Sequence, residues 1–172
     1  MDKQNQILQK LTYGFYVVTA LKPGEELKTR DKDFIAAGTI NWLTQVSFEP
    51  PMVAIAVDMQ SDLNETIDHS EHFTVHILSA AQESWIEKFG GDSTIENGKI
   101  NGVEYITKDN ELILHGTIGH FTCKIDKNKS ISAGDHTVHV GEVISVHLED
   151  ESATPICTKE KQMQYKPAHA EA

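Results

Sequence analysis

Residues 34–58, FIAAGTINWLTQVSFEPPMVAIAVD, decide the fold, because two apolar runs flank a polar segment and a double proline. Gly38 removes a side chain, so a ligand can approach the backbone closely at that point. The prolines at 50–51 stop any helix and extend the chain into the next apolar run. We therefore predict a polar turn over residues 38–47. The strand 52–57 that follows is apolar throughout, so we expect both of its faces to be covered.

Neutral polar side chains gather in the predicted turn. Hydroxyls and an amide suit a phosphate or the polar edge of a ring, and they carry no charge of their own. A plain turn between two strands explains the same pattern, so both interpretations stay open on these residues alone. The side chains concerned are Thr39, Asn41, Thr44 and Ser47.

Length and charge limit the class of protein. A chain of 172 residues is expected to form one domain, here 1–172, with a core at about 12–148 and a polar tail over 152–172. Acidic residues outnumber basic ones by 26 to 15, which argues against nucleic acid as a partner.

Two further features concern location. No apolar run reaches the length that spans a membrane, and the first nine residues are polar, without the apolar centre of a signal peptide. Cys123 and Cys157 are too few for a disulfide framework. We therefore expect a cytoplasmic protein without a membrane partner.

The order of predicted elements indicates a mainly β protein, a β-barrel with helices inserted at a few connections. Ile7, Leu8 and Leu11 have helical spacing, and the glycines at 116 and 119 mark a bend or bulge. The expected helices cover 2–11, a segment that starts near 61, and 80–89; the expected strands cover 13–20, 33–38, 52–57, 73–79, 111–126 (one long strand or a bent pair) and 135–148; the expected turns and loops cover 22–33, 92–102 and 127–130.

The last predicted strand carries a histidine at its start. Its even positions, from His136 through Val138 and Val140 to Leu148, are mostly apolar, so we expect this face to be buried. His139 and the other odd positions would then point away from the core. On these residues alone, His136 is either a structural hydrogen-bonding group or part of a site.

Nine histidines also raise the question of a metal site. The candidate pairs lack an accompanying Glu-x-x-His or Cys-x-x-Cys motif, so the sequence gives little support for a metal. Cys123 lies within a predicted strand and is interpreted as a buried small apolar residue. The pairs are His69 with His72, His115 with His120, and His136 with His139.

Several motifs together resemble the flavin reductase-like family of FMN-binding split barrels. The family pattern Gly-x-Thr-x-(Ser/Asn) leading into Thr-Ser-Val-Ser and Pro-Pro is similar to residues 38–51, although Trp42 and Gln45 depart from it. The segment 134–143, GDHTVHVGEV, resembles the family motif Gly-Asp-His-x-(Ile/Val)-x-(Ile/Val)-Gly-x-Val. Phe121-x-Cys123 and the strand FTVHIL, with His76 where the family has Asn, are also similar.

The resemblance implies a split β-barrel that binds FMN and forms a homodimer. The implied activity is NAD(P)H-dependent flavin reduction, with electrons passed to free flavin or to a partner acceptor, and the cofactor carries the redox chemistry. An alternative is a non-catalytic FMN electron carrier, similar to flavoredoxin and reduced by a redox partner protein, which the net charge of -11 and Trp42 would favour. A haem-binding split barrel is a weaker alternative that rests only on the histidines.

The resemblance also implies a set of site residues. Thr39, Asn41, Ser47 and Ser61 would hold the ribityl phosphate and the ring edges, and the backbone of Ile40, Asn41 and Trp42 would face the isoalloxazine. Ser61 is also interpreted as a plain helix N-cap, and a helix N-terminus suits a phosphate. His136 would serve the nicotinamide side. Gln45, Asp58 and Gln60 complete the predicted site.

Overall fold

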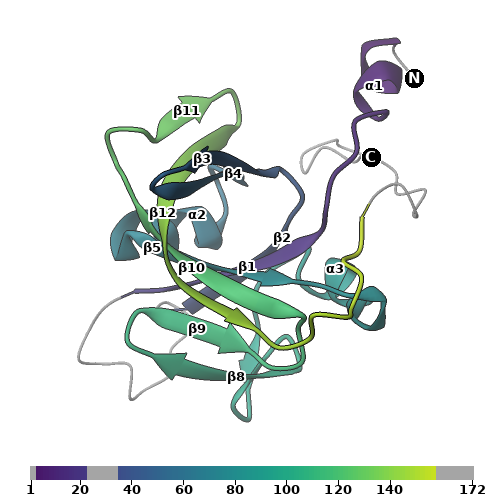
Figure 1. Cartoon of the computed structure of the whole chain (residues 1–172), viewed down its shortest axis with the longest axis vertical. Coiled ribbons are helices and arrows are strands. Elements are labelled where there is room, and N and C mark those ends of the chain that lie inside the picture. Colours follow the sequence, from purple (N-terminus) through teal and green to yellow (C-terminus); the bar gives the residue numbers. More distant parts are fainter. Residues whose placement is uncertain (1–2, 23–34, 158–172) are drawn as a thin grey trace.

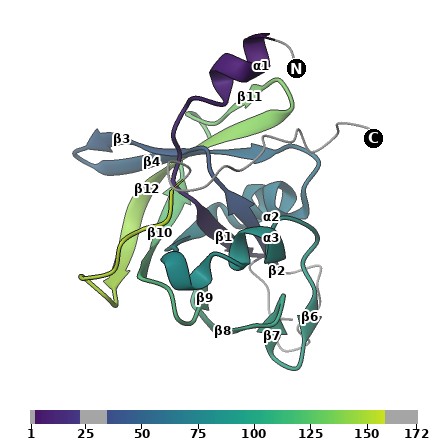
Figure 2. The ribbon, with the colours of Figure 1, turned by 90° about the vertical axis from the view of Figure 1, so that its right-hand side faces the viewer.

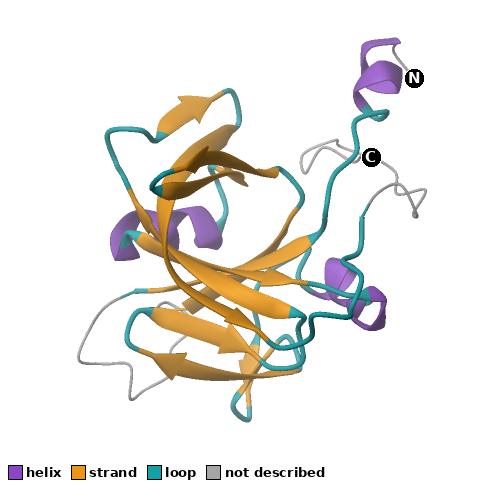
Figure 3. Cartoon of the chain, in the orientation of Figure 1, coloured by secondary structure: helices purple, strands orange, loops and turns teal. Residues whose placement is uncertain are grey.

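The computed structural model describes residues 3–22 and 35–157, and its chain is built mainly from strands (Figures 1 and 3). The helices are α1 Lys3–Leu8, α2 Asp62–Ser70 and α3 Trp85–Lys88, with a short 3-10 helix at Ala80–Gln82. The strands are β1 Tyr16–Leu21, β2 Ile35–Ile40, β3 Leu43–Phe48, β4 Pro51–Asp58, β5 His72–Ile77, β6 Ile95–Glu96, β7 Lys99–Ile100, β8 Val103–Lys108, β9 Glu111–Leu114, β10 Gly119–Ile125, β11 Ile131–Ala133 and β12 His136–Leu148.

The larger sheet has the strand order β2-β1-β5-β10-β12-β4-β3, with β11 added beside β12. All of its pairings are antiparallel, and the sheet curls around α2 (Figure 1). A smaller sheet with the order β6-β7-β8-β9 lies next to the curled sheet (Figure 2). This arrangement confirms the predicted β-barrel with inserted helices.

Two apolar clusters fill the molecule. The first lies between β1, β2, α3 and the smaller sheet, and includes Phe15, Phe89 and Leu112. The second lies inside the curl under α2, and includes Ile55, Ile67 and Phe73. Successive side chains of a strand point to opposite faces, so β1 and β2 contribute to both clusters.

Coverage of both faces was expected for residues 52–57, and it holds only in part, because Met52 on the second face is buried but its neighbours there are not. In β4, Val53, Ile55 and Val57 are buried, while Ala54 and Ala56 are only partly covered. The apolar run is satisfied on one side by the core of the curl, and the small alanines lie on its other side.

The predicted polar turn over 38–47 is also wrong for most of its length. The chain turns at residues 41–42 and then forms β3, which pairs with β4 as a hairpin closed at residues 49–50. Polar and apolar residues alternate along an exposed hairpin strand, so the hydroxyl-rich sequence suits β3 as well as a turn.

Two other predicted segments differ from the structure. Residues 80–89 form two short helical pieces instead of one helix, because Ser79 caps the first piece in a capping box and the chain turns at 83–84. Residues 92–102 are not a plain surface loop, because β6 and β7 form a hairpin whose Ile100 is fully buried.

The bent-pair alternative for 111–126 is confirmed, with β9 and β10 in different sheets. Strand β8 was not predicted, although it pairs along its length with β9.

The buried face of β12 is the opposite of the predicted one. His139 and Gly141 are buried, because they face the interior of the curl, where Gly141 lets Phe73 and Cys123 approach. A register irregularity opposite Thr122 and Cys123 also interrupts the alternation. Several apolar side chains of the other face stay exposed, namely Ile144, Val146 and Leu148.

The remaining predictions agree in outline. The N-terminal helix exists as α1, but Ile7, Leu8 and Leu11 are exposed. The strand predicted at 13–20 is observed at 16–21, and the one predicted at 33–38 at 35–40. The turn and loop expected over 23–33 and the tail from 158 lie outside the described residues. The described helices are too short or too polar to span a bilayer.

Candidate functional site

Three segments that are far apart in the sequence meet at the end of β4. The amide of Ala56 donates to the Trp42 carbonyl at 3.0 Å, which places the turn at 41–42 beside the end of β4. Asp58, the last residue of β4, pairs with His136, the first residue of β12. The amide of Met59 then donates to the Asp135 carbonyl at 3.0 Å. Backbone hydrogen bonds therefore fix all three segments around one position.

The side chains of Trp42 and His136 lie next to each other at this position. Their ring centroids are 4.9 Å apart and their planes are inclined by 49°. His136 Nδ1–H donates to the carboxylate of Asp135 at 2.6 Å, which in the neutral ring leaves Nε2 as the acceptor. The His136 side chain is 24% exposed, so an incoming molecule can reach it.

The N-terminus of α2 forms the third side of the site. Ser61 caps the helix, because its Oγ accepts a hydrogen bond from the Asn64 amide at 3.1 Å and donates to the Asp58 carbonyl at 2.7 Å. The Asp58 carboxylate accepts from the Gln60 amide at 2.8 Å. The N-cap interpretation of Ser61 is confirmed, and the free amides of the first helical turn suit an anion.

Gln45 and Ser47 lie at the other end of the β3–β4 hairpin. Ser47 pairs with Met52, whereas Asp58 and His136 mark the opposite end of β4. At about 3.3 Å per residue, the strand between Met52 and Asp58 spans about 20 Å. The Gln45 side chain donates to the Ser47 carbonyl at 3.0 Å. Within one chain, these two residues are not part of the group around His136.

Thr39 and Ile40 serve the packing of this chain. The Thr39 hydroxyl donates to the Ile86 carbonyl at 2.8 Å and its amide donates to the Phe89 carbonyl at 2.9 Å, so it anchors α3. Ile40 is buried in the cluster inside the curl. Of the predicted residues, Asn41, Trp42, Asp58, Gln60, Ser61 and His136 belong to the three converging segments.

A polar network behind the site was not predicted. His139 is completely buried, and burial lowers its pKa, an effect that Asp68 partly opposes. Its Nε2–H donates to the side-chain carbonyl of Asn64 at 2.8 Å. The sequence contains one signal for this network, which is a histidine within an otherwise apolar strand. His139 faces the core because the odd positions around it are the buried ones.

Asp135 was also left out of the predicted site. Its position directly before His136 is the signal that would have indicated a role in orienting that ring. Over residues 3–22 and 35–157, no group of three or more His, Cys, Asp or Glu side chains is placed to hold a metal ion. Cys123 is buried and burial raises its pKa to about 12, which confirms that it acts as a small core residue.

The donor set suits a flavin phosphate and ring. An aromatic ring and an imidazole lie side by side, and the N-terminus of α2 with its Ser61 cap follows directly after the end of β4. The two carboxylates nearby, Asp58 and Asp135, already accept hydrogen bonds from Gln60 and His136.

Comparison with known proteins supports this interpretation. A sequence family described as flavin reductase like domain matches residues 8–166. The chain is 28% identical over 152 residues to FMN reductase (NADH) SmoA of Agrobacterium fabrum, covering 87% of this chain and 77% of that protein. It is 27% identical over 139 residues to the high molecular weight rubredoxin of Moorella thermoacetica, covering 79% of this chain but only 56% of that protein.

A solved structure has the same fold. It is the NADH:FAD oxidoreductase SgcE6 of Streptomyces globisporus C-1027, in complex with NAD and FAD fragments, with a TM-score of 0.73 and 20% identity. The superposition covers 98% of this chain and 93% of that one.

Proposed function

This chain belongs to the flavin reductase-like family, and from that premise we propose that it binds FMN and reduces flavin with NADH or NADPH. Reduced flavin would then pass electrons to free flavin or to a partner acceptor. A relative named FMN reductase (NADH), matched over 87% of this chain, supports the reaction class. The single observation that carries the proposal is the convergence of Trp42, His136 and the N-terminus of α2 around the end of β4.

The residues of this chain divide into two groups by the part of FMN that they would hold. Ser61 and the first amides of α2 would bind the phosphate, because the helix N-terminus offers unpaired donors and a positive dipole end. Asn41 and the backbone at 40–42 would meet the polar edge and face of the ring. Trp42 would cover part of the ring and exclude water from it.

The bound FMN supplies the hydride-accepting ring, so this chain needs no acid or base for the hydride step itself. His136 would instead orient the nicotinamide and hold or release a proton at Nε2. Asp135 fixes the tautomer and the direction of that imidazole through the bond to Nδ1–H.

We further propose that the protein is a homodimer. Apolar side chains that a monomer leaves in water are candidates for such an interface. Within one chain, Gln45 and Ser47 lie about 20 Å along β4 from His136. In the proposed dimer, these two residues of one copy would lie close to the site of the other copy. The exposed large apolar residues on β3 and β12 are Val46, Phe48, Ile144, Val146 and Leu148.

We propose a cytoplasmic location. Cys123 and Cys157 are both free thiols, and free thiols persist in a reducing compartment.

Fluorescence of the two tryptophans tests where the flavin binds. Titration with FMN should quench the emission of the wild-type protein, and Trp42→Phe should remove most of that quenching. Trp85→Phe is the matched control, because Trp85, the first residue of α3, packs against Phe89 outside the proposed site. Equal loss of quenching in the two variants would contradict the proposed position.

A second candidate function is an electron carrier without nicotinamide activity. The contact between Trp42 and His136 favours it, because a ring over the flavin would keep a nicotinamide from stacking there. The relative named high molecular weight rubredoxin is consistent with this candidate. A bound flavin that a reduced protein partner reduces, while NADH and NADPH do not, would decide for the carrier.

A further inference from the structure

His139 is a buried polar side chain in a place where an apolar one would pack. It lies on the inner face of β12, opposite Ile55 of β4, and no part of its side chain is exposed. Leu63 and Ile67 of α2 and Ile55 make this region apolar. Its Nδ1 has no hydrogen-bond partner among the described residues. Buried polar atoms are nearly always paired, so such an exception calls for a reason.

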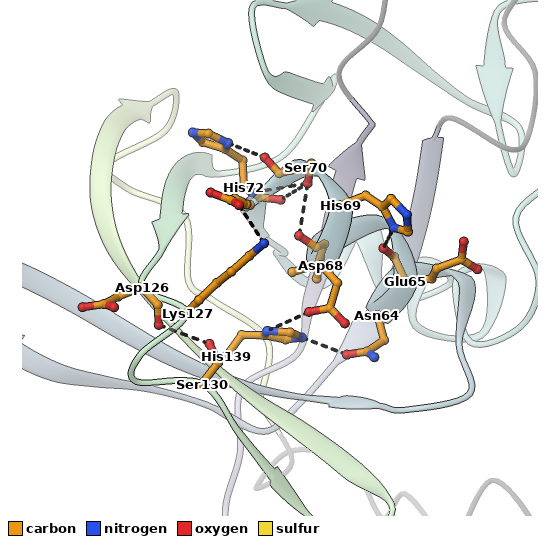
Figure 4. Close-up of polar contacts among 12 residues, drawn as sticks. Asn64, Glu65, Asp68, His69, Ser70, His72, Asp126, Lys127, Ser130 and His139 are labelled. Carbon is orange, nitrogen blue, oxygen red and sulfur yellow. Dashed lines mark hydrogen bonds and ion pairs between the residues drawn. The ribbon is translucent and has the colours of Figure 1, made fainter.

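The other ring nitrogen supplies that reason. A neutral imidazole donates through one nitrogen only, and Nε2–H donates to Asn64 Oδ1 at 2.8 Å, whereas the Asp68 carboxylate is 4.0 Å from Nδ1 (Figure 4). Asn64 is itself 7% exposed, so this hydrogen bond is made away from water. In Figure 4 the ring of His139 points at the underside of α2 between Asn64 and Asp68.

Asn64 continues the contact to the proposed site. Its backbone amide donates to Ser61 Oγ at 3.1 Å, and Ser61 Oγ donates to the Asp58 carbonyl at 2.7 Å. A chain of hydrogen bonds therefore runs from His139 on β12, through Asn64, to the N-cap of α2 and the end of β4. His136, on the same strand, contacts Trp42 at the opposite side of the site.

The other end of α2 is held separately. The Ile125 amide donates to the Glu71 carbonyl at 2.8 Å, and the Glu71 carboxylate pairs with Lys127 at 2.7 Å. Between the two ends, α2 contacts the sheet mainly through apolar side chains, which pack without directional bonds. The first turn is held by directional contacts as well: two hydrogen bonds from Ser61 to the Asp58 carbonyl, the ion pair of Glu65 with Lys22, and the hydrogen bond from His139. The bond from His139 is the one that reaches Asn64 from the core side of the helix.

We propose that His139 is a positioning residue for flavin binding: through Asn64 it holds Ser61 and the first amides of α2 where the flavin phosphate binds. The proposal rests on the proposed function. It concerns the phosphate only, because His139 lies beneath α2 and the ring of the flavin would lie beside Trp42 and His136. A change at His139 should therefore weaken the binding of FMN, which carries a phosphate. It should leave the binding of riboflavin, which has no phosphate, unchanged.

Two amide variants separate this role from simple packing. In His139→Gln the side-chain nitrogen takes the position of Nε2 and can still donate to Asn64. In His139→Asn the amide is shorter and matches the position of Nδ1, so the bond to Asn64 is lost. Asn64→Ala removes the acceptor instead and serves as the second route to the same result if His139→Asn does not fold.

The experiment measures dissociation constants of FMN and riboflavin for the wild type and the three variants. Amide hydrogen exchange of residues 61–65 in the flavin-free protein gives a second readout. We expect His139→Gln to bind FMN like the wild type. We expect His139→Asn and Asn64→Ala to bind FMN about tenfold more weakly, as for a displaced hydrogen bond to a charged group, with riboflavin affinity unchanged. Their first turn of α2 should exchange faster.

Other results would overturn the proposal. Equal FMN affinity of the Gln and Asn variants, or an equal loss for FMN and riboflavin, would show that His139 only fills space. A wild-type protein that binds neither flavin would overturn the proposed function and this proposal with it. FMN binding that all three variants share with the wild type would overturn this proposal alone.

Discussion

Trp42 and His136 are 94 positions apart in the sequence, yet their rings lie with centroids 4.9 Å apart on adjacent segments of one site. Trp42 follows β2 and His136 opens β12, and β4 joins the two through backbone hydrogen bonds. One face of the proposed flavin site is therefore built by the order of strands in the curled sheet. A change in either ring should affect the reaction and leave the fold intact.

Ser61 offers a test in which helix capping and phosphate binding separate. Ser61→Ala should lower the free energy of unfolding by about 1 kcal/mol through loss of the cap. Ser61→Asp keeps a good cap but places a negative charge beside the phosphate, so stability should be retained while FMN affinity falls and riboflavin affinity does not. Urea unfolding and flavin titrations measure the two effects. Normal FMN binding by Ser61→Asp would exclude the phosphate from this helix N-terminus.

The site could be predicted from the sequence only in part. The segments around Trp42 and His136 were identified because the motifs at 38–51 and 134–143 resemble the family patterns, and Ser61 because it lies in the loop between an apolar strand and a predicted helix. His139 and Asn64 were missed, because the sequence shows which face of β12 is apolar but not which face the core covers. Gln45 and Ser47 were also predicted at the site, but within one chain they lie at the far end of the β3–β4 hairpin from His136, and a motif does not show how a strand pairs.

The buried His76 should make stability depend on acid pH. Its Nδ1–H donates to the Val17 carbonyl and its Nε2 accepts from the Leu114 amide, both at 3.0 Å. Burial lowers its pKa from 6.5 to about 3. The unfolded chain therefore binds a proton below about pH 6.5 that the native protein does not bind until about pH 3, so the free energy of unfolding falls as pH falls through this window.

His76→Gln tests that dependence, because Gln does not titrate. Between about pH 7.5 and about pH 5 the free energy of unfolding of the wild type should fall by about 2 kcal/mol because of His76. In the variant, the change of this free energy with pH should lack that part, whatever the variant's own stability. His69→Gln, at an exposed position of α2, is the control and should keep the wild-type slope. Urea unfolding at both pH values measures the slopes, and an unchanged slope in His76→Gln would refute the assignment.

Gly141 should be intolerant of any side chain. A Cβ at this position would lie 2.8 Å from the Cβ of Cys123 and 3.1 Å from Cε1 of Phe73, and both residues are buried. Gly141→Ala should destabilise the protein by about 1–3 kcal/mol. In Gly91→Ala, the new Cβ meets no heavy atom of the described chain within 4 Å, so stability should change little. Equal unfolding midpoints in urea would contradict this packing.

The exposed Phe48 tests the proposed dimer. Its side chain is 89% exposed at the end of β3, and Val146 on β12 is 74% exposed. Phe48→Asp should shift the sedimentation equilibrium from dimer to monomer, because a buried unpaired charge opposes association. Ile106→Asp on β8 of the smaller sheet is the control and should stay dimeric. A wild-type protein that sediments as a monomer would contradict the proposed dimer.

The fold was more predictable than its details. The strand-rich pattern and the double proline predicted a mainly β fold with inserted helices. This prediction succeeded because hydrophobic alternation and proline determine the conformation of the chain over a few neighbouring residues. The hairpin of β6 and β7, which buries Ile100, was missed because its strands are two residues long and polar around the turn. The outward apolar face of β12 was assigned to the core because a sequence does not distinguish a buried apolar face from one that stays exposed in the folded chain.

Anaerobic reduction of the FMN-loaded protein tests the central claim most directly. NADH or NADPH is mixed with the wild type, His136→Ala and the control His69→Ala while the visible absorbance of the oxidised flavin is followed. We expect rapid bleaching in the wild type and the control, and bleaching about ten- to a hundredfold slower in His136→Ala, as for loss of one positioning or proton-transfer group. A bound flavin that stays oxidised with both nucleotides in the wild type would contradict the reductase and identify an electron carrier.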